Sequence, residues 1–559
     1  MRRPPRASGA PGNDPAVRSE DGPDRDPDRA AHVARPRDAD SAGYPDYLAA
    51  SRLDWRRIGD LLACAARGSA GGSDIALPWT GAPLCTVTAC GPGEVAEAAA
   101  RARRAQARWS ATPIGQRRAV VAAFLGRLAD RSDEALDLVQ LETGKARRDA
   151  LEEVADVALV GGYYGRRAAD LLRPRRRAGV IPFLTRVWEM RRPRGVVGII
   201  APWNYPLALG ASDALPALLA GNAVLLKPDL QTTLSALWIA EALRASGLPE
   251  DVFQVVPGDG PGTGAALVEH VDFLMFTGST ETGRTVARRA GERLIGCTLE
   301  LGGKNALVVL DDADVERAVA GILRGCFANA GQLCISLERV LVHRNLYADV
   351  RAALERATPT LVLGPGLRYD VDVGSLISAG QLGRTRAHLE DALELGARVL
   401  VGGRARPDLG PWFHEPTVLE DVPDAALAAR VETFGPVVSI AAFADEDDAA
   451  RRANLGPYGL NASVWTGDLV RGRRFATRIR AGTVNVNDAY GAAWASVDAP
   501  MGGFGDSGVG RRHGAEGLLK YTEPQTIAAQ AGHPLHTPAG LGHETTARAV
   551  NALLRALRR

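Results

Sequence analysis

The sequence predicts an α/β protein built around a parallel, doubly wound sheet, and two observations predict this class. Short runs of purely apolar residues recur along the chain, as expected for strands that helices cover on both faces. Helical segments separate these runs at a spacing typical of βαβ units. Four runs predict the strands of a first sheet: 196–200, 223–226, 253–256 and 273–276.

Helices are predicted before and between these strands. Ala- and Arg-rich tracts predict helices at 94–109, 116–130 and 132–142; Pro92 and Gly93 precede the first tract, and Gly144 follows the last. A helix at 233–246 separates the second strand from the third and is ended by Gly247 and Pro249. A second α/β segment starts with the apolar run 306–310 and continues to about residue 515.

Three segments depart from this pattern. Residues 1–44 are rich in Pro, Asp, Arg and Gly without an apolar period, which predicts a disordered leader. The basic segment 173–194 predicts a solvated hairpin or an arm that contacts another subunit. Residues 533–559 form a C-terminal tail, and 545–559 predict an amphipathic basic helix. Docking on its own domain, docking on a neighbouring subunit and attachment to a membrane surface are all open for this helix.

Composition excludes several classes of function. The chain has 559 residues, 46% of them hydrophobic and 24% charged, which suits a soluble protein of several domains. A net charge of +2 gives no basic field for nucleic acid. No apolar run reaches about 18 residues, so no integral membrane contact is expected. The 6 cysteines lack a C-x-x-C pair and the 9 histidines lack ligand spacing, so we expect a cytoplasmic protein without a metal.

Two segments at predicted strand ends are typical of nucleotide binding. The turn 276–283 (FTGSTETG) follows a strand and opens a helix, where backbone N–H groups and the helix dipole suit a pyrophosphate. It carries only two glycines of the G-x-G-x-x-G fingerprint. Lys227 ends another strand, where side chains point into the ligand crevice of open α/β sheets. The chain has only three other lysines, which favours a ligand role: Lys145, Lys304 and Lys520.

A cysteine, a glutamate and an asparagine are candidates for covalent catalysis. Cys334 lies in a small, polar segment, 329–336 (NAGQLCIS), where it is either an accessible nucleophile or a small hydrophobe in a helix. Glu300 precedes two glycines that leave room for a substrate, and it can act as a base for water. Asn204 lies between two prolines after a strand, where its amide suits an oxyanion donor or a loop cap.

Together these segments resemble the aldehyde dehydrogenase superfamily over about residues 75–525. Eight motifs occur in the order of that family, and 34 positions (334 − 300) separate Glu300 from Cys334. The motifs are PWNYP (202–206), KP (227–228), FTGSTETG (276–283), ELGGK (300–304), GQLC (331–334), ETFGP (432–436), GTVNVN (482–487) and PMGGFGDSG (500–508). Within the family, the sequence is most similar to bacterial succinate-semialdehyde dehydrogenases of an actinobacterial type.

The resemblance implies the aldehyde dehydrogenase fold, with a Rossmann-like cofactor domain, an α/β catalytic domain and a small oligomerisation arm. The cofactor domain would cover 45–170 and 192–300, and the catalytic domain 301–519. The arm would comprise 171–191 and 520–532. The implied partners are a small-molecule aldehyde and further copies of the chain, in a homodimer or a homotetramer.

The resemblance also implies NAD(P)-dependent oxidation of an aldehyde to a carboxylic acid, with succinate semialdehyde the substrate of the most similar branch. Cys334 would attack the aldehyde carbon, Asn204 would hold the oxyanion, and Glu300 would activate the water that hydrolyses the thioester. The implied cofactor contacts are Trp203, Asn204, Lys227, Pro228, Asp229, Leu230, Gly278, Ser279, Leu301, Glu432 and Phe434.

Two features depart from the family pattern. Leu230 stands where NAD-preferring members commonly carry a glutamate bonded to the adenosine ribose, so either NADP or NAD is expected. A well-studied succinate-semialdehyde branch clamps the distal carboxylate of its substrate with arginines, and this chain has 212–213 (SD) and 327–328 (FA) near those positions. Candidates for a more apolar aldehyde tunnel, or for plain core, are Tyr205, Leu209, Tyr490 and Trp494.

Three rival classes are weaker on the same residues. A CoA-acylating aldehyde dehydrogenase would share the cysteine but would not need Glu300. A cofactor-independent thioester or ester hydrolase could use Cys334 and Glu300, but it would leave the nucleotide-binding motifs unexplained. A non-catalytic protein on this scaffold would be expected to have lost Cys334, Glu300 or Asn204, and all three are present.

Overall fold

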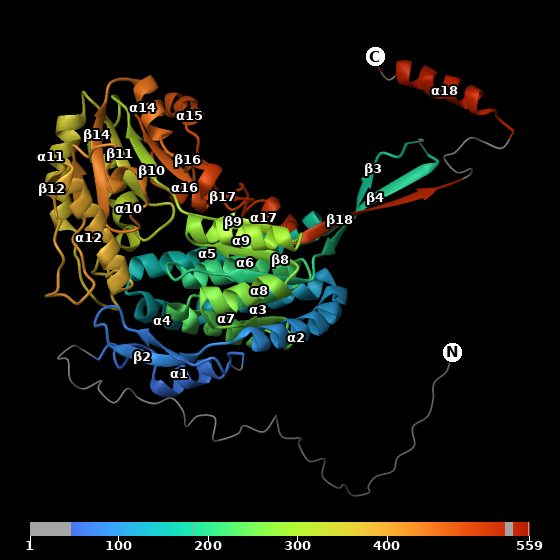
Figure 1. Ribbon diagram of the computed structural model, residues 1–559, viewed down its shortest axis with the longest axis horizontal. Helices are drawn as coiled ribbons and strands as arrows, with labels where there is room; N and C mark the ends of the chain where they lie inside the picture. Colours follow the sequence, from blue (N-terminus) through green and yellow to red (C-terminus); the bar gives the residue numbers. More distant parts are fainter. Residues whose placement is uncertain (1–45, 67, 181–182, 532–539, 557, 559) are drawn as a thin grey trace, which may run out of the picture.

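The computed structural model describes residues 46–66, 68–180, 183–531, 540–556 and 558, and Figure 1 shows its helices and strands. The leader predicted at 1–44 lies outside these residues. Within the described ranges, the strands form sheets of six, seven, three and two strands.

The six-stranded sheet confirms the predicted doubly wound fold. Its strand order is β17-β9-β8-β5-β6-β7, and neighbouring strands are parallel except β17 (Gly508–Val509), which runs antiparallel to β9. Within this sheet, β5 comes first in the sequence and lies between β8 and β6, so the winding direction reverses between β5 and β8. The parallel strands are β5 (Val196–Ile200), β6 (Ala223–Lys227), β7 (Phe253–Val255), β8 (Phe273–Thr277) and β9 (Gly296–Glu300). Each predicted strand lies within one residue of these bounds.

Helices cover both faces of this sheet. One face packs against α2 (Pro92–Ala111), α8 (Ala265–His270) and α9 (Thr280–Glu292), and the other packs against α6 (Pro206–Leu219) and α7 (Thr233–Ala245). Behind α6 and α7 lie α3 (Ile114–Asp130), α4 (Ser132–Thr143) and α5 (Arg147–Leu172), and the N-terminal elements are α1 (Trp55–Leu62), β1 (Gly72–Ala76) and β2 (Pro83–Thr88). The predicted helices are confirmed, and Gly144 ends α4 with φ 73°, the left-handed conformation that glycine tolerates.

The seven-stranded sheet is the second α/β unit that the sequence predicts. Its order is β12-β13-β14-β11-β10-β15-β16, parallel throughout except for β12. The strands are β10 (Asn305–Val309), β11 (Leu337–His343), β12 (Arg398–Val401), β13 (Thr417–Glu420), β14 (Val437–Phe443), β15 (Asn461–Trp465) and β16 (Thr483–Val486). The helices of this part are α10 (Val315–Phe327), α11 (Tyr347–Ala357), α12 (Ala379–Glu394), α13 (Leu427–Arg430), α14 (Glu446–Ala453), α15 (Leu469–Ala476), α16 (Gly491–Trp494) and α17 (Glu516–Leu519).

The basic segment forms a hairpin, as predicted, and a distant strand joins it. The hairpin consists of β3 (Arg175–Arg177) and β4 (Thr185–Pro193), and β18 (Thr522–Gln530) pairs with β4 along its whole length. Figure 1 shows this three-stranded sheet projecting from the body. Beyond it lies α18 (His543–Ala556), the amphipathic helix predicted for the tail, which has no buried residue. No helix of the described residues is both long and apolar enough to span a bilayer.

The predicted domain boundaries stay predictions. The chain passes from the six-stranded to the seven-stranded sheet between β9 and β10, close to the predicted division at residue 300. Strand β17, from the segment assigned to the catalytic domain, returns to the edge of the six-stranded sheet. This return brings the end of the catalytic segment next to Glu300.

Candidate active site

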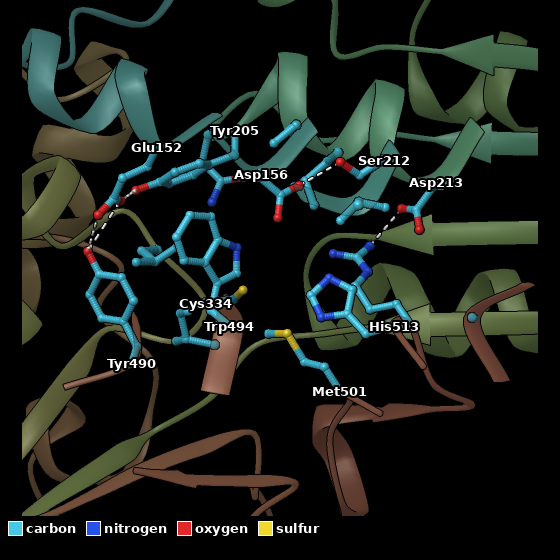
Figure 2. Close-up of a pocket in the computed structure, with 18 of the residues that line it drawn as sticks. Glu152, Asp156, Tyr205, Ser212, Asp213, Cys334, Tyr490, Trp494, Met501 and His513 are labelled. Carbon is cyan, nitrogen blue, oxygen red and sulfur yellow. Dashed lines mark hydrogen bonds and ion pairs between the residues drawn. The ribbon is translucent and has the colours of Figure 1, made fainter. Parts of the chain in front are cut away.

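Two cavities meet at Cys334 and Asn204. The first, shown in Figure 2, encloses about 740 Å³ including its open mouth, and the second about 680 Å³. The first is lined by Glu152, Asp156, Val160, Tyr164, Asn204, Tyr205, Ala208, Leu209, Ser212, Asp213, Pro216, Leu333, Cys334, Ile335, Tyr490, Trp494, Met501, Arg512, His513 and Gly517. The second is lined by Pro202, Trp203, Asn204, Thr277, Gly278, Ser279, Glu300, Leu301, Gly302, Cys334, Gln381, Arg384, Glu432 and Phe434. We call them the aldehyde cavity and the cofactor cleft.

The cofactor cleft lies at the carboxyl ends of the central strands. Trp203 and Asn204 follow β5, Gly278 follows β8, and Leu301 follows β9. The winding direction of the sheet reverses between β5 and β8, and such a switch point is where open α/β sheets bind ligands. Ser279 caps α9, because its hydroxyl accepts a hydrogen bond from the Thr282 N–H at 3.2 Å. The N-terminus of α9 therefore faces the cleft, as a phosphate site requires.

Cys334 follows a strained turn that side chains hold in place. Asn329 and Ala330 have φ of 50° and 55°, a conformation that costs non-glycine residues about 1–3 kcal/mol each. The Asn329 N–H donates to Asp149 Oδ2 at 2.9 Å. Asn305 Nδ2 donates to the Cys334 carbonyl at 2.8 Å. No hydrogen bond within the described ranges engages the Cys334 N–H, which leaves it free to act as a donor to a substrate oxygen.

Asn204 is positioned through its backbone as well as its side chain. Its Nδ2 donates to the Gln332 carbonyl at 3.1 Å, two residues before the cysteine, which leaves the second amide hydrogen for a ligand. Its own carbonyl accepts a hydrogen bond from Lys145 Nζ at 2.6 Å. Lys145 in turn pairs with Glu153 at 2.5 Å, and both side chains are fully buried. Glu153 also accepts from the Leu207 N–H at 2.8 Å, at the start of α6.

Glu300 is buried at the end of β9 without an ion pair. Only 4% of the residue is exposed, and its Oε1 has no hydrogen-bond partner among the described residues. Burial raises the pKa of Glu300 to about 7, against the opposing effect of the positive charge on Arg512. Burial likewise raises the pKa of the Cys334 thiol to about 12, again opposed by Arg512. The carboxyl group can therefore exchange a proton near neutral pH, whereas the resting thiol is protonated.

The far wall of the cofactor cleft carries Glu432 and Phe434. Glu432 Oε1 accepts a hydrogen bond from the Gly303 N–H at 2.9 Å, and burial followed by the charge on Glu338 raises its pKa to about 8. A Cβ at Gly302 would lie 2.2 Å from the Glu432 carboxylate, so a side chain there would displace that carboxylate from its present position. The Phe434 ring meets the Trp203 ring edge to face, with centroids 5.5 Å apart.

A buried ion pair behind this wall was not predicted. Glu338 binds Lys304 Nζ and accepts from the N–H groups of Thr433 and Phe434, each at 3.0 Å. Phe434 has φ of 55°, so these bonds hold a strained residue. Gln381 and Arg384 also line the cleft, and no sequence signal had pointed to them.

The segment after β6 carries further predicted cofactor contacts. Lys227 is buried, with 6% of the residue exposed, and its Nζ donates to the Pro228 carbonyl at 2.8 Å. Burial lowers its pKa, opposed by the negative charges of Asp229 and Asp259. The Asp229 carboxylate accepts from the Gln231 N–H at 3.0 Å, and Leu230 begins a short 3₁₀ turn. Neither Lys227 nor Leu230 is among the described residues that line the cleft.

The aldehyde cavity has apolar walls with engaged carboxylates. All four residues suggested for an apolar tunnel line it, and Figure 2 shows Tyr205 and Tyr490 converging on Glu152. The Tyr490 hydroxyl donates to Glu152 at 3.0 Å, and Arg324 binds the same carboxylate. Asp156 accepts from the Ser212 hydroxyl at 2.6 Å.

Two residues of the aldehyde cavity were missed by the sequence reasoning. Arg512 is the one cationic side chain among the described lining residues, and its guanidinium binds Asp213 at 2.7 Å. His513 is buried with φ of 61°, and burial, with help from the charge on Arg512, lowers its pKa to about 3, so its ring is neutral.

Comparisons with known proteins identify the family. The family model "Aldehyde dehydrogenase family" matches residues 67–527. A Mycobacterium ulcerans protein with the provisional name succinate-semialdehyde dehydrogenase (NADP+) 2 is 48% identical over 463 residues, 83% of this chain and 89% of that protein. A Mycobacterium tuberculosis aldehyde dehydrogenase solved with NAD+ is 36% identical and superposes with a TM-score of 0.79, covering 84% of this chain and 96% of that one. An NADP-dependent enzyme from E. coli is 34% identical, also with a TM-score of 0.79, over 82% and 95% of the two chains.

This chain belongs to the aldehyde dehydrogenase family. The family model spans most of the chain, and the fold is the one that the resemblance implied. Among the described residues, no group of three or more His, Cys, Asp or Glu side chains is arranged to hold a metal ion.

Proposed function

We propose that this protein oxidises an aldehyde to a carboxylic acid, with NADP or NAD as hydride acceptor. One observation carries the proposal: Cys334 and Asn204 line both cavities, so a nucleophile and an oxyanion donor lie where substrate and cofactor would meet. Glu300, a carboxyl group able to exchange protons at neutral pH, opens onto the cofactor side of that junction.

The cofactor cleft fits a nicotinamide dinucleotide. The Gly302 cradle beside Glu432, the facing rings of Trp203 and Phe434, and the capped N-terminus of α9 suit a ribose, a nicotinamide ring and a pyrophosphate respectively. When bound, the nicotinamide supplies the acceptor for a hydride from the aldehyde carbon.

In the first step, Cys334 Sγ bonds to the aldehyde carbon and its proton leaves to water. The carbonyl electron pair moves to oxygen, where Asn204 Nδ2 and the Cys334 N–H donate hydrogen bonds; one such donor is worth about 10²–10³ in rate. Loss of hydride leaves a thioester on Cys334. Glu300 then takes a proton from water as its oxygen attacks the thioester carbon, the C–S bond breaks, and the acid leaves.

The charges of the aldehyde cavity bear on the choice of substrate. The mycobacterial relative is named for succinate semialdehyde, which carries a distal carboxylate. The aldehyde cavity carries three carboxylates and one guanidinium, and Asp213 already binds that guanidinium. We therefore propose two candidate substrates, succinate semialdehyde and a neutral aliphatic or aromatic aldehyde. The charges on the cavity wall favour the neutral aldehyde.

Reduced-cofactor absorbance distinguishes these readings. Succinate semialdehyde, hexanal and benzaldehyde would each be supplied with NAD and with NADP, beside a Cys334→Ala control. A higher kcat/KM for the two neutral aldehydes than for succinate semialdehyde would retire the relative's substrate for this chain. The opposite order would mean that Arg512 or another cation reaches the substrate carboxylate. Absence of turnover with every aldehyde and both cofactors would refute the proposed function itself.

We further propose a cytoplasmic homodimer or homotetramer that assembles through the arm formed by 171–191 and 520–532. The projecting sheet of β3, β4 and β18 supports this proposal, since β3 and most of β18 are exposed. Light scattering of the purified protein at micromolar concentration would test it, and a monomer mass would contradict it.

A further inference from the structure

Arg512 connects elements that are distant in the sequence and converge on the junction of the two cavities. Its Nη2 donates to Asp213 Oδ2 on α6 at 2.7 Å and to Thr277 Oγ1 at the end of β8 at 3.0 Å. Lys520 Nζ lies 3.8 Å from the other oxygen of Asp213. One nitrogen of the guanidinium is thus bound by both an acid and a hydroxyl, while its Nε has no hydrogen-bond partner among the described residues.

The register of the sheet places this guanidinium next to Glu300. Thr277 on β8 and Glu300 on β9 are register partners in a parallel pair, and such partners project their side chains to the same side of the sheet. On the other edge of β9, Gly508 is the register partner of Glu300, so the chain that leads to Arg512 also runs alongside Glu300. Arg512 and Cys334 line the same cavity.

The other charged groups around these two side chains do not replace Arg512. The positive charges of Lys520 and Arg511 also lower the pKa of Glu300, and the negative charge of Asp213 raises it. Cys334 faces the carboxyl groups of Glu300 and Glu432, and Arg512 is the cation that most favours its thiolate. Glu300 Oε1 has no hydrogen-bond partner in the part of the chain that the structure describes, so its charge depends on these neighbours.

We propose that Arg512, oriented by Asp213 and Thr277, is a positioning residue that supplies the fixed positive charge for both anions of the reaction, the Cys334 thiolate and the Glu300 carboxylate. The inference rests on the proposed function for its kinetic part. It assigns Asp213 the task of orienting Arg512, which accounts for a buried carboxylate on the wall of the aldehyde cavity.

The first test is independent of cofactor and substrate. Cys334 is alkylated with iodoacetamide at pH 8, and mass spectrometry of the peptide that contains Cys334 follows the rate of alkylation. The variant Cys334→Ala shows how much alkylation comes from the other cysteines. Opposite charges within a few ångströms change a pKa by about 1–3 units, so Arg512→Met should slow alkylation roughly 10- to 100-fold. Arg512→Lys, which keeps the charge, should retain at least about a third of the rate.

The second test is the pH profile of kcat with hexanal, a neutral substrate. The acid limb should move up by about one pH unit in Arg512→Met, so that activity lost at pH 7 returns at pH 9. The double variant Arg512→Met/Asp213→Asn removes both charges and avoids a stranded buried carboxylate. Its acid limb should move in the same direction but less far, because the negative charge of Asp213 also raises the pKa of Glu300. Arg288→Met, which changes an exposed arginine on α9, is the matched control.

Two outcomes would overturn the inference. One is alkylation at the wild-type rate in folded Arg512→Met and in the double variant. The other is an unchanged pH profile with a loss confined to succinate semialdehyde, which would make Arg512 a substrate anchor instead. If the wild type oxidised no aldehyde, the proposed function would fail, while the alkylation test would still decide whether Arg512 supports the thiolate.

Discussion

The two cavities that meet at Cys334 hold their carboxylates in opposite ways. On the wall of the aldehyde cavity, Glu152 pairs with Arg324 and Asp213 pairs with Arg512. In the cofactor cleft, Glu300 and Glu432 form no salt bridge with any described residue, and their pKa values are raised to about 7 and about 8. On the aldehyde side two of the three carboxylates are held by arginines, and the third, Asp156, accepts a hydrogen bond from Ser212 and has its pKa raised by burial. On the cofactor side neither carboxyl group is held by a cation, and both can exchange protons near neutral pH.

This difference suggests separate tasks for the two sets of carboxyl groups: one shapes the substrate cavity, and the other transfers protons. A carboxylate bound to an arginine is held in one position, which suits a wall that must present constant packing to a substrate. A buried, unpaired carboxyl group has its pKa moved toward neutrality, which suits a proton carrier. The predictions below test this division, from the largest expected effect to the smallest.

The largest effect is expected at the junction itself. Cys334→Ala should lower aldehyde oxidation by more than about 10⁴-fold, because no other group can form the thioester. Cofactor titration by quenching of tryptophan fluorescence should give a dissociation constant within a few-fold of wild type, since the cleft keeps all its other residues. Oxidation that persists in this variant would assign the covalent step to another side chain.

The buried ion pair between Lys145 and Glu153 should contribute to the free energy of unfolding. Lys145→Met leaves Glu153 buried without its cation, and breaking such a pair by removing one partner costs about 3–5 kcal/mol. Thermal unfolding should show the loss. The double variant Lys145→Met/Glu153→Gln should recover much of it, but with a lower kcat, because the Asn204 carbonyl has lost its ammonium donor. Equal stability of the single and double variants would argue against a coupled pair.

The proton-carrying side should respond to pH. Glu300 acts as a base only when ionised and has a pKa of about 7, so kcat for hydrolysis should rise through pH 7 and fall about tenfold per unit below it. Glu300→Gln should remove this limb and leave a slow, pH-independent rate, measurable by stopped-flow as accumulation of the thioester. A wild-type limb near pH 4.5 would mean that the carboxyl group is not buried during catalysis.

The smallest effect is expected beyond the cleft lining. Leu230→Glu places a carboxylate in the segment after Lys227, where it would repel a 2′-phosphate. We expect KM for NADP to rise about tenfold and KM for NAD to change little. Leu230→Gln, of similar size and without charge, is the control, and an equal response of the two variants would assign the effect to packing.

Local patterns predicted most of the fold. The apolar run 196–200 became β5 without a change of bounds, and Gly144 ends α4 because only a residue that tolerates positive φ fits there. The motifs around Asn204, Glu300 and Cys334 lie together because each follows a strand end or a turn at the same edge of the sheets. Hydrophobic periodicity and turn residues depend only on neighbouring positions, so they can be recognised in a single sequence.

Long-range pairs could not be predicted in this way. In the sequence, nothing distinguishes Arg512 from the other arginines. Its proposed role depends on Asp213, which lies 299 residues earlier in the chain. Lys145 stood out by its rarity, but nothing in its neighbours pointed to the Asn204 carbonyl. The stabilisation of the site depends on such tertiary contacts, which periodicity does not encode.

The burial of all four lysines has a consequence for handling the protein. At most 9% of each is exposed: Lys145, Lys227, Lys304 and Lys520. The other basic side chains of the chain, histidines aside, are arginines. A folded molecule thus offers aldehydes almost no lysine amine with which to condense, and an excess of substrate should leave its surface unmodified. Amine-directed labels should modify lysines only as the chain unfolds, which makes lysine acylation, separated from acylation of the terminal amine, a direct count of unfolded molecules.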